Sequence, residues 1–201
     1  MESIIDRSIE AHPPLGLLVQ NMHFDILDTT RIDSFMPYIP AVNLINLFGN
    51  DGVRDSTISA IATHIPSLAR LYIDGCTNLT SACLPDLKRL KRLRILFLTS
   101  EFVDDMEALS LVCALPILEC IRLENASVTN CLVYWLVTEF KLQEEGNPAS
   151  RFPSFLCHVA LSDCPGMIEE CRSSIVLIHL TLPYASCQIL SALIFLTYMG
   201  I

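Results

Sequence analysis

Apolar residues recur along this chain with a spacing of three residues followed by two. The clearest copy is Leu68, Leu71 and Ile73, and the same steps start again at Val42, one copy earlier, and at Leu93, one copy later. An apolar residue at every second position predicts a short strand whose alternate side chains share one face. A spacing kept over several copies predicts stacked repeats, because one unit cannot bury its apolar side alone.

The second half of each unit has a different pattern. In segments such as 56–63 and 104–112 the apolar residues lie three or four apart, which predicts one face of a short helix. Asp104 and Glu107 have the spacing of a helix-capping box. The core positions predicted for the four central units are Val42, Ile45, Leu47, Val53, Ile58 and Ile61; Leu68, Leu71, Ile73, Leu79, Leu84 and Leu87; Leu93, Leu96, Leu98, Val103, Met106 and Leu109; and Leu118, Ile121, Leu123, Val128, Leu132 and Leu136.

Weaker copies extend the pattern in both directions. They begin at Val19, at Leu156 and at Leu177. We therefore expect about seven units, each roughly 21–26 residues long, with one insertion at about 138–151. Residues 1–14 are expected to form a capping helix, and residues 15–201 the repeat domain. The last unit, 173–201, is apolar and lacks an evident polar cap, which predicts a truncated or degenerate end, or an edge that docks a partner.

These residues resemble the leucine-rich-repeat family, whose units read L-x-x-L-x-L-x-x-N/C before a helical half. The unit lengths, the Ile65-Pro66 lead-in and the stretch Cys76-Thr77-Asn78-Leu79-Thr80 are most similar to the cysteine-containing and ribonuclease-inhibitor-like subclasses. The resemblance implies an α/β solenoid with a curved parallel sheet on the concave side and short helices on the convex side. Asn50, Cys76 and Cys164 fill the Asn/Cys position, whereas Leu27, Glu101, Ala126 and Ala185 depart from it.

Residues between the buried positions of each strand are expected on the concave face. Their mixture of aromatic and charged types is typical of protein-protein hot spots. Scattered surface residues of this kind also occur without any function. The candidate partner-binding residues are Asn46, Phe48, Arg70, Tyr72, Asp74, Phe97, Thr99, Arg122 and Glu124.

A second charged feature is the run from residue 88 to residue 94. It contains five cations in seven residues, Lys88, Arg89, Lys91, Arg92 and Arg94, which we define as the basic cluster. The alternatives are a solvated turn after a helix, a nuclear-import signal, or a docking patch for an acidic partner.

Composition and charge narrow the function. The residues AVILMFWYC make up 52% of the 201 residues, and the net charge of −9 argues against broad nucleic-acid binding. Nine cysteines without framework spacing, and an N-terminus without a secretory signal, predict reduced thiols in the cytoplasm, with the nucleus as the alternative.

No metal-binding or catalytic motif is evident in the sequence. Cys157, Cys164 and Cys171 are evenly spaced, but the repeat register predicts that they diverge rather than bind zinc. Phosphate-binding loops, nucleophile elbows and His-Glu-x-x-His motifs are lacking. We therefore expect this protein to have no enzymatic activity and to use no cofactor, metal or small-molecule substrate.

The sequence favours a non-enzymatic scaffold that binds a protein on its concave sheet. An alternative is the substrate-recognition component of a ubiquitin ligase, because the cysteine-containing repeats resemble those of F-box adaptors. About 14 residues precede the first repeat, fewer than an F-box module needs, so we expect that module to lie on another chain or to have been lost. A membrane-attached repeat protein is the second alternative, because residues 173–201 contain no Asp, Glu, Lys or Arg.

Overall fold

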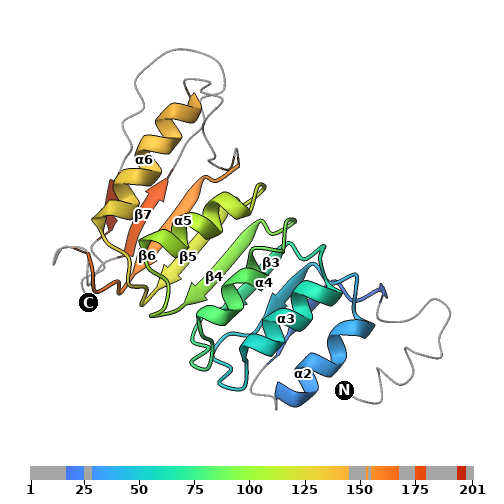
Figure 1. Cartoon of the computed structure of the whole chain (residues 1–201). Helices are drawn as coiled ribbons and strands as arrows, with labels where there is room; N and C mark the ends of the chain where they lie inside the picture. The colour runs from blue at the N-terminus through green and yellow to red at the C-terminus, as the bar shows by residue number, and fades with distance from the viewer. Residues whose placement is uncertain are drawn as a thin grey trace. The chain divides into compact units, whose positions relative to one another are not determined.

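Short strands and helices alternate along the chain in the computed structural model, which describes residues 17–24, 29–144, 153, 155–167, 175–179 and 194–197. Two compact units, Met1–Phe97 and Leu98–Ile201, are described in turn. Both have α/β architecture, as the alternating apolar periods predict (Figure 1). The expected capping helix at 1–14 lies outside the described residues.

The first unit contains four parallel-sheet strands in the order of the sequence. Its elements are β1 (Asn21–His23), α2 (Thr29–Phe35), η2 (Met36–Tyr38), β2 (Leu44–Asn46), α3 (Asp55–His64), β3 (Arg70–Ile73), η3 (Ser81–Cys83), α4 (Leu84–Leu87) and the start of β4 (Ile95–Thr99). β1 pairs with β2 and β2 with β3 in parallel, with Asn21 opposite Leu44 and Leu44 opposite Arg70. Figure 1 shows α2, α3 and α4 on one side of these strands.

Recurring backbone hydrogen bonds explain why the strands of this unit keep register. The carbonyl of Ala69 accepts from the N–H groups of Arg94 and Ile95, at 2.8 and 3.0 Å. The carbonyl of Asn43, one repeat earlier, accepts in the same way from two N–H groups at the start of the next strand. Each apolar lead-in also closes a tight turn, as where the Leu68 N–H donates to the Ile65 carbonyl at 3.1 Å.

The second unit begins in β4 and continues with the same alternation. Its further elements are α5 (Asp105–Ala114), β5 (Cys120–Glu124), α6 (Asn130–Glu144), β6 (His158–Ser162), β7 (Ile175–His179) and β8 (Ile194–Thr197). β5 and β6 pair in parallel, with Ile121 opposite Val159. Of the capping box predicted for α5, the Asp104 half is confirmed, because the Asp104 carboxylate accepts the Glu107 N–H at 2.9 Å.

The strand predicted for the last unit differs from the structure. β7 pairs with β6 in antiparallel orientation, and β8 pairs with β7 in the same way, so the parallel continuation is wrong here. Only residues 163–174 separate β6 from β7, which is close to the shortest connection that returns a strand in parallel. An antiparallel return has no such minimum length.

The predicted insertion also begins with regular structure. α6 continues to Glu144, so residues 138–144 extend a helix rather than start an exposed loop. Residues 145–151 of the insertion lie outside the described part of the chain.

The predicted core is confirmed except in one helix. In the first two central units all twelve predicted positions are buried, most of them with no exposed surface. In α5, however, Met106 is 72% exposed and Leu109 is only half-buried, while Ala108, Leu111 and Val112 are buried. The reason is helix phase: Asp104 caps the helix, and the buried positions then follow as in α3, two repeats earlier, where Ile58 and Ile61 are buried.

Candidate functional site

Alternate strand residues of the first unit point away from the helices and form what we call the far face of its sheet. In β3, Leu71 and Ile73 are fully buried, whereas Arg70 and Tyr72 are half-buried. β2 and β4 alternate in the same way. The far face therefore presents side chains that are held by their neighbours yet keep accessible surface.

Two aromatic rings lie together on this face. Tyr72 and Phe97 have ring centroids 4.8 Å apart and planes at 87°, an edge-to-face contact. Such a pair contributes about 0.5–1.5 kcal/mol beyond the burial of its area. Because both rings are half-buried and each restrains the other, they form a rigid apolar platform on the far face.

Asn46 and Phe48 shape one end of this face. The Asn46 Oδ1 accepts the Phe48 N–H at 2.9 Å, so the amide of Asn46 is used to hold the turn after β2. Phe48 itself is 69% exposed. Gly49 follows with a φ of 64°, a left-handed conformation that glycine adopts at little cost. The tight turn leaves the Phe48 ring projecting into solvent.

Asp74 differs from the prediction that it is available to a partner. Its side chain is buried, with 4% exposed, and its carbonyl accepts the Gly49 N–H at 2.8 Å. Gly75 repeats the left-handed turn with a φ of 72°. Asp74 therefore belongs to the packed end of the strand, and in the first unit Arg70, Tyr72, Phe97 and Phe48 remain as accessible candidates.

The second unit carries the other three candidates. Thr99 ends β4 and is half-buried, while Arg122 and Glu124 lie two apart on β5 and so share one face. Arg122 Nη2 and Glu124 Oε2 are 3.2 Å apart, with 34% and 28% of the side chains exposed. A pair this accessible contributes little stability, and its charges stay available for contact with a partner.

The turns after β2, β3, β5 and β6 carry a signal that the sequence analysis missed. Asn125 and Asp163 of the second unit have φ values of 53° and 52°, at the position that Gly49 and Gly75 occupy in the first unit. Asn and Asp tolerate the left-handed region better than other side chains. The recurrence of Gly, Asn and Asp one residue before the Asn/Cys position was visible in the sequence.

Two Asp–Thr clamps join consecutive helices, and the sequence analysis missed these as well. The Asp55 carboxylate accepts the Thr80 N–H at 2.9 Å and the Thr80 hydroxyl at 2.6 Å. In the second unit the Asp105 carboxylate accepts the same two groups of Thr129, at 2.7 and 2.5 Å. The acid opens one helix and the threonine precedes the next, so each clamp fixes one repeat on another.

The Asn/Cys position is buried at four of the five described places. Asn50, Cys76, Ala126 and Cys164 are buried, and Glu101 is exposed. The Cys76 thiol donates to the Leu47 carbonyl at 3.2 Å. Burial raises the pKa of Cys76 to about 11, so this thiol is protonated at neutral pH and packs as a small apolar group.

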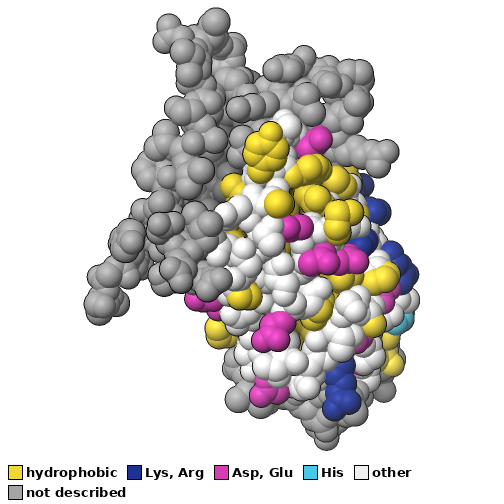
Figure 2. Space-filling model, turned by 60° about the vertical axis from the view of Figure 1, so that its left-hand side comes forward, with side chains coloured by type: hydrophobic (Ala, Val, Ile, Leu, Met, Phe, Trp, Pro, Cys, Tyr) yellow, Lys and Arg dark blue, Asp and Glu magenta, His cyan; other side chains and the backbone are white. Residues whose placement is uncertain are grey.

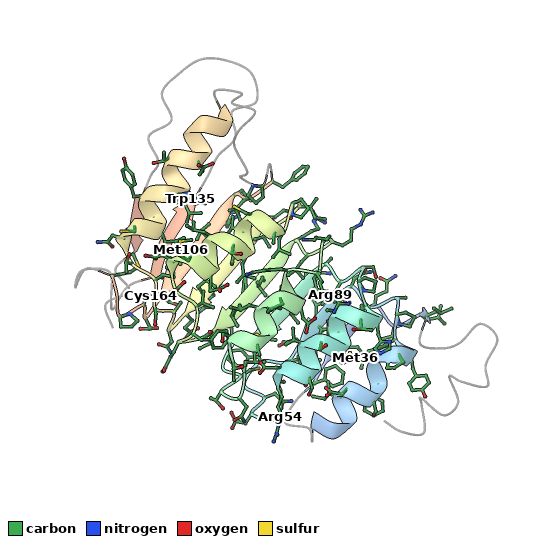
Figure 3. The ribbon with its side chains drawn as sticks, in the orientation of Figure 1. Met36, Arg54, Arg89, Met106, Trp135 and Cys164 are labelled. Carbon is green, nitrogen blue, oxygen red and sulfur yellow. The ribbon has the colours of Figure 1, made fainter. Side chains whose placement is uncertain are left out.

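The basic cluster lies in the first unit, at the turn from α4 into β4. Arg89, Lys91, Arg92 and Arg94 are exposed, and Lys88 is half-buried. Arg89 follows α4 and Arg54 precedes α3, so the two arginines lie at opposite ends of the helices (Figure 3). Figure 2 shows acidic side chains spread over the visible face, with the Lys and Arg side chains gathered in a few places.

Metal and catalytic chemistry have little support in the described residues. Within them, no group of three or more His, Cys, Asp or Glu side chains is arranged to hold a metal ion. Cys157 Sγ and His158 Nδ1 are 3.0 Å apart, but burial raises the pKa of the Cys157 thiol. A raised pKa opposes the thiolate that nucleophilic catalysis requires.

The structure bears on the membrane alternative in one respect. Across the described ranges, no helix combines the length and the apolar character needed to cross a bilayer. Most of the uncharged segment 173–201 lies outside these ranges.

Comparison with protein-family models gives no match to this chain, and a search of curated proteins gives no significant match.

Proposed function

We propose that this chain is a leucine-rich-repeat protein of about seven units that binds a partner protein through the far face of its sheet and has no catalytic activity. The repeat assignment is supported by hydrogen bonds that recur at the repeat spacing. Asn43 and Ala69 in the first unit, and Glu119 in the second, each accept two N–H groups from the start of the next strand. In such proteins the far face becomes the concave binding surface.

The observation that carries the binding proposal is the Tyr72–Phe97 pair. Aromatic residues and arginine dominate binding energy at protein interfaces, because they bury large areas with few rotatable bonds. The two rings are already held edge to face, so a partner does not need to order them. Arg70 lies on the same strand and face as Tyr72 and supplies a charge that orients the partner.

The site fits a protein rather than a small ligand. Its candidates follow three neighbouring strands, and Phe48 stands 69% exposed at one end. Protein interfaces combine a central apolar cluster with a polar rim. Tyr72 and Phe97 would form the centre of such an interface, with Arg70 at its polar rim.

A comparison of three variants tests this proposal. Tyr72→Ala and Phe97→Ala remove one ring each from the far face. Tyr38→Ala is the matched control, because Tyr38 is an aromatic residue of the same unit that is 42% exposed but lies in η2 and not on a strand. Partners captured by cross-linking in cells would be identified by mass spectrometry, and each candidate purified for titration calorimetry.

A direct partner should bind the wild type and Tyr38→Ala equally. Each far-face variant should weaken the complex about tenfold or more, because a hot-spot residue contributes about 2 kcal/mol. Circular dichroism would establish that all three variants are folded. Equal affinity of all variants for every purified partner would refute the far face as the binding site.

The proposal places the protein in the cytoplasm, with the nucleus as the alternative. None of the seven cysteines of the described residues forms a disulfide, and burial raises the pKa of five of them, among them Cys83 to about 12. Protonated thiols of this kind suit a reducing compartment. The narrower assignment to a ubiquitin-ligase adaptor rests on the resemblance of the repeats alone.

A further inference from the structure

The basic cluster stands out against the charge of the whole chain. Five of the 13 Lys and Arg residues lie within residues 88–94, in a protein of net charge −9. α4 contributes one acidic residue beside them, Asp86. The cluster is therefore a local patch of positive charge on an acidic protein.

The backbone holds this cluster in a fixed shape. Leu90 and Leu93 have no exposed surface and anchor the segment in the core. The Leu90 N–H donates to the Leu87 carbonyl at 3.1 Å, and the Leu93 N–H donates to the Leu90 carbonyl at 2.9 Å. If this segment acted as an extended linear signal, both leucines would have to leave the core. The structure therefore disfavours the nuclear-import alternative.

One cation of the cluster already forms an ion pair with a carboxylate of the chain. Arg89 Nη1 lies 2.7 Å from Asp86 Oδ1, while 55% of the Arg89 side chain stays exposed. Three of the five cations are arginines, whose planar guanidinium presents paired donors that match a carboxylate. The chemistry that fits this turn is a short series of carboxylates.

We propose that the basic cluster is a docking site for a short acidic segment of a partner protein. The site is distinct from the far face, because the cations lie at the turn between α4 and β4. A nucleic acid fits less well: its phosphates form a long continuous series of charges, and beyond the cluster they would meet an acidic surface. A few carboxylates, in contrast, can be bound by the cations of the turn alone.

Fluorescence anisotropy with labelled octaglutamate tests the proposal. The full chain would be titrated at low and at physiological salt, with a labelled uridine decanucleotide as the competing probe. Arg92→Glu reverses one exposed charge of the cluster. Arg54→Glu is the matched control, because Arg54 is also exposed, lies in the same unit and changes the net charge equally.

We expect octaglutamate to bind the wild type, with weaker binding at higher salt. Arg92→Glu should weaken the complex about threefold to tenfold, and Arg54→Glu less than twofold. Lys91→Glu combined with Arg92→Glu should abolish measurable binding, with melting temperatures showing that the variants are folded. Equal effects of Arg92→Glu and Arg54→Glu, no binding of octaglutamate, or tighter cluster-dependent binding of the oligonucleotide would each overturn the proposal.

Discussion

The Asp–Thr clamps predict a measurable coupling between neighbouring repeats. In the first unit, Asp55→Ala removes the carboxylate and Thr80→Val removes the hydroxyl while keeping the side-chain shape. Each single variant also loses a further interaction outside the clamp. Asp55 sits in the first turn of α3, and the Thr80 hydroxyl accepts the Ala82 N–H at 3.2 Å. The double variant allows these separate losses to cancel.

The expected coupling follows from the geometry of the hydroxyl–carboxylate bond. A hydrogen bond to a charged group contributes about 1.5–3 kcal/mol. Thr80 is exposed, so solvent lowers this to about 1 kcal/mol. The Asp105–Thr129 bond is half-buried, and we expect about 2 kcal/mol there. The two clamps should therefore differ in the direction that their burial predicts.

Urea unfolding of the wild type, the two single variants and the double variant gives the coupling in each unit. Circular dichroism and tryptophan fluorescence should report the same transition, because the cycle assumes two-state unfolding. Coupling energies below about 0.3 kcal/mol in both units would refute the clamps as bonds between repeats. A larger coupling at the exposed pair than at the half-buried pair would refute the dependence on burial.

Three further predictions concern packing and pH. Gly166→Ala would place a Cβ 2.6 Å from the Val128 carbonyl oxygen, so we expect a loss of about 1–3 kcal/mol; unchanged stability in urea would contradict this contact. Met106→Lys should change stability by less than about 0.5 kcal/mol, whereas Leu111→Ala should cost about 2–5 kcal/mol; the reverse order would show that α5 has another phase. Burial raises the pKa of Cys76 from 9.0 to about 11, so its stabilisation is complete below pH 9 and is lost as pH rises to 11. Stability should then fall more steeply in the wild type than in Cys76→Ala, by up to about 3 kcal/mol over that range, and equal slopes would contradict the shift.

Spacing predicted the fold better than hydrophobicity did. The strand positions of the first unit followed directly from the steps of three and two residues, because a strand exposes alternate faces whatever residues it contains. In α5 the prediction chose Met106 and Leu109 over Ala108 and Leu111, and so preferred the larger Met106 to Ala108. Counted from the N-cap of each helix, Ala108 and Leu111 take the places in α5 that Ile58 and Ile61 take in α3. The N-cap therefore fixes helix phase more reliably than side-chain size.

The strand register could not predict which residues of the far face have structural roles and which remain accessible to a partner. Asn46, Tyr72 and Asp74 were all expected on one surface, because they alternate with core residues. Asn46 holds the turn below Phe48, and Asp74 is buried at the end of its strand, so both have structural roles. Tyr72 keeps exposed surface and is positioned by Phe97, which lies one repeat later in the sequence. A residue suited to binding is one whose neighbours hold it without covering it, and contacts across strands determine that property.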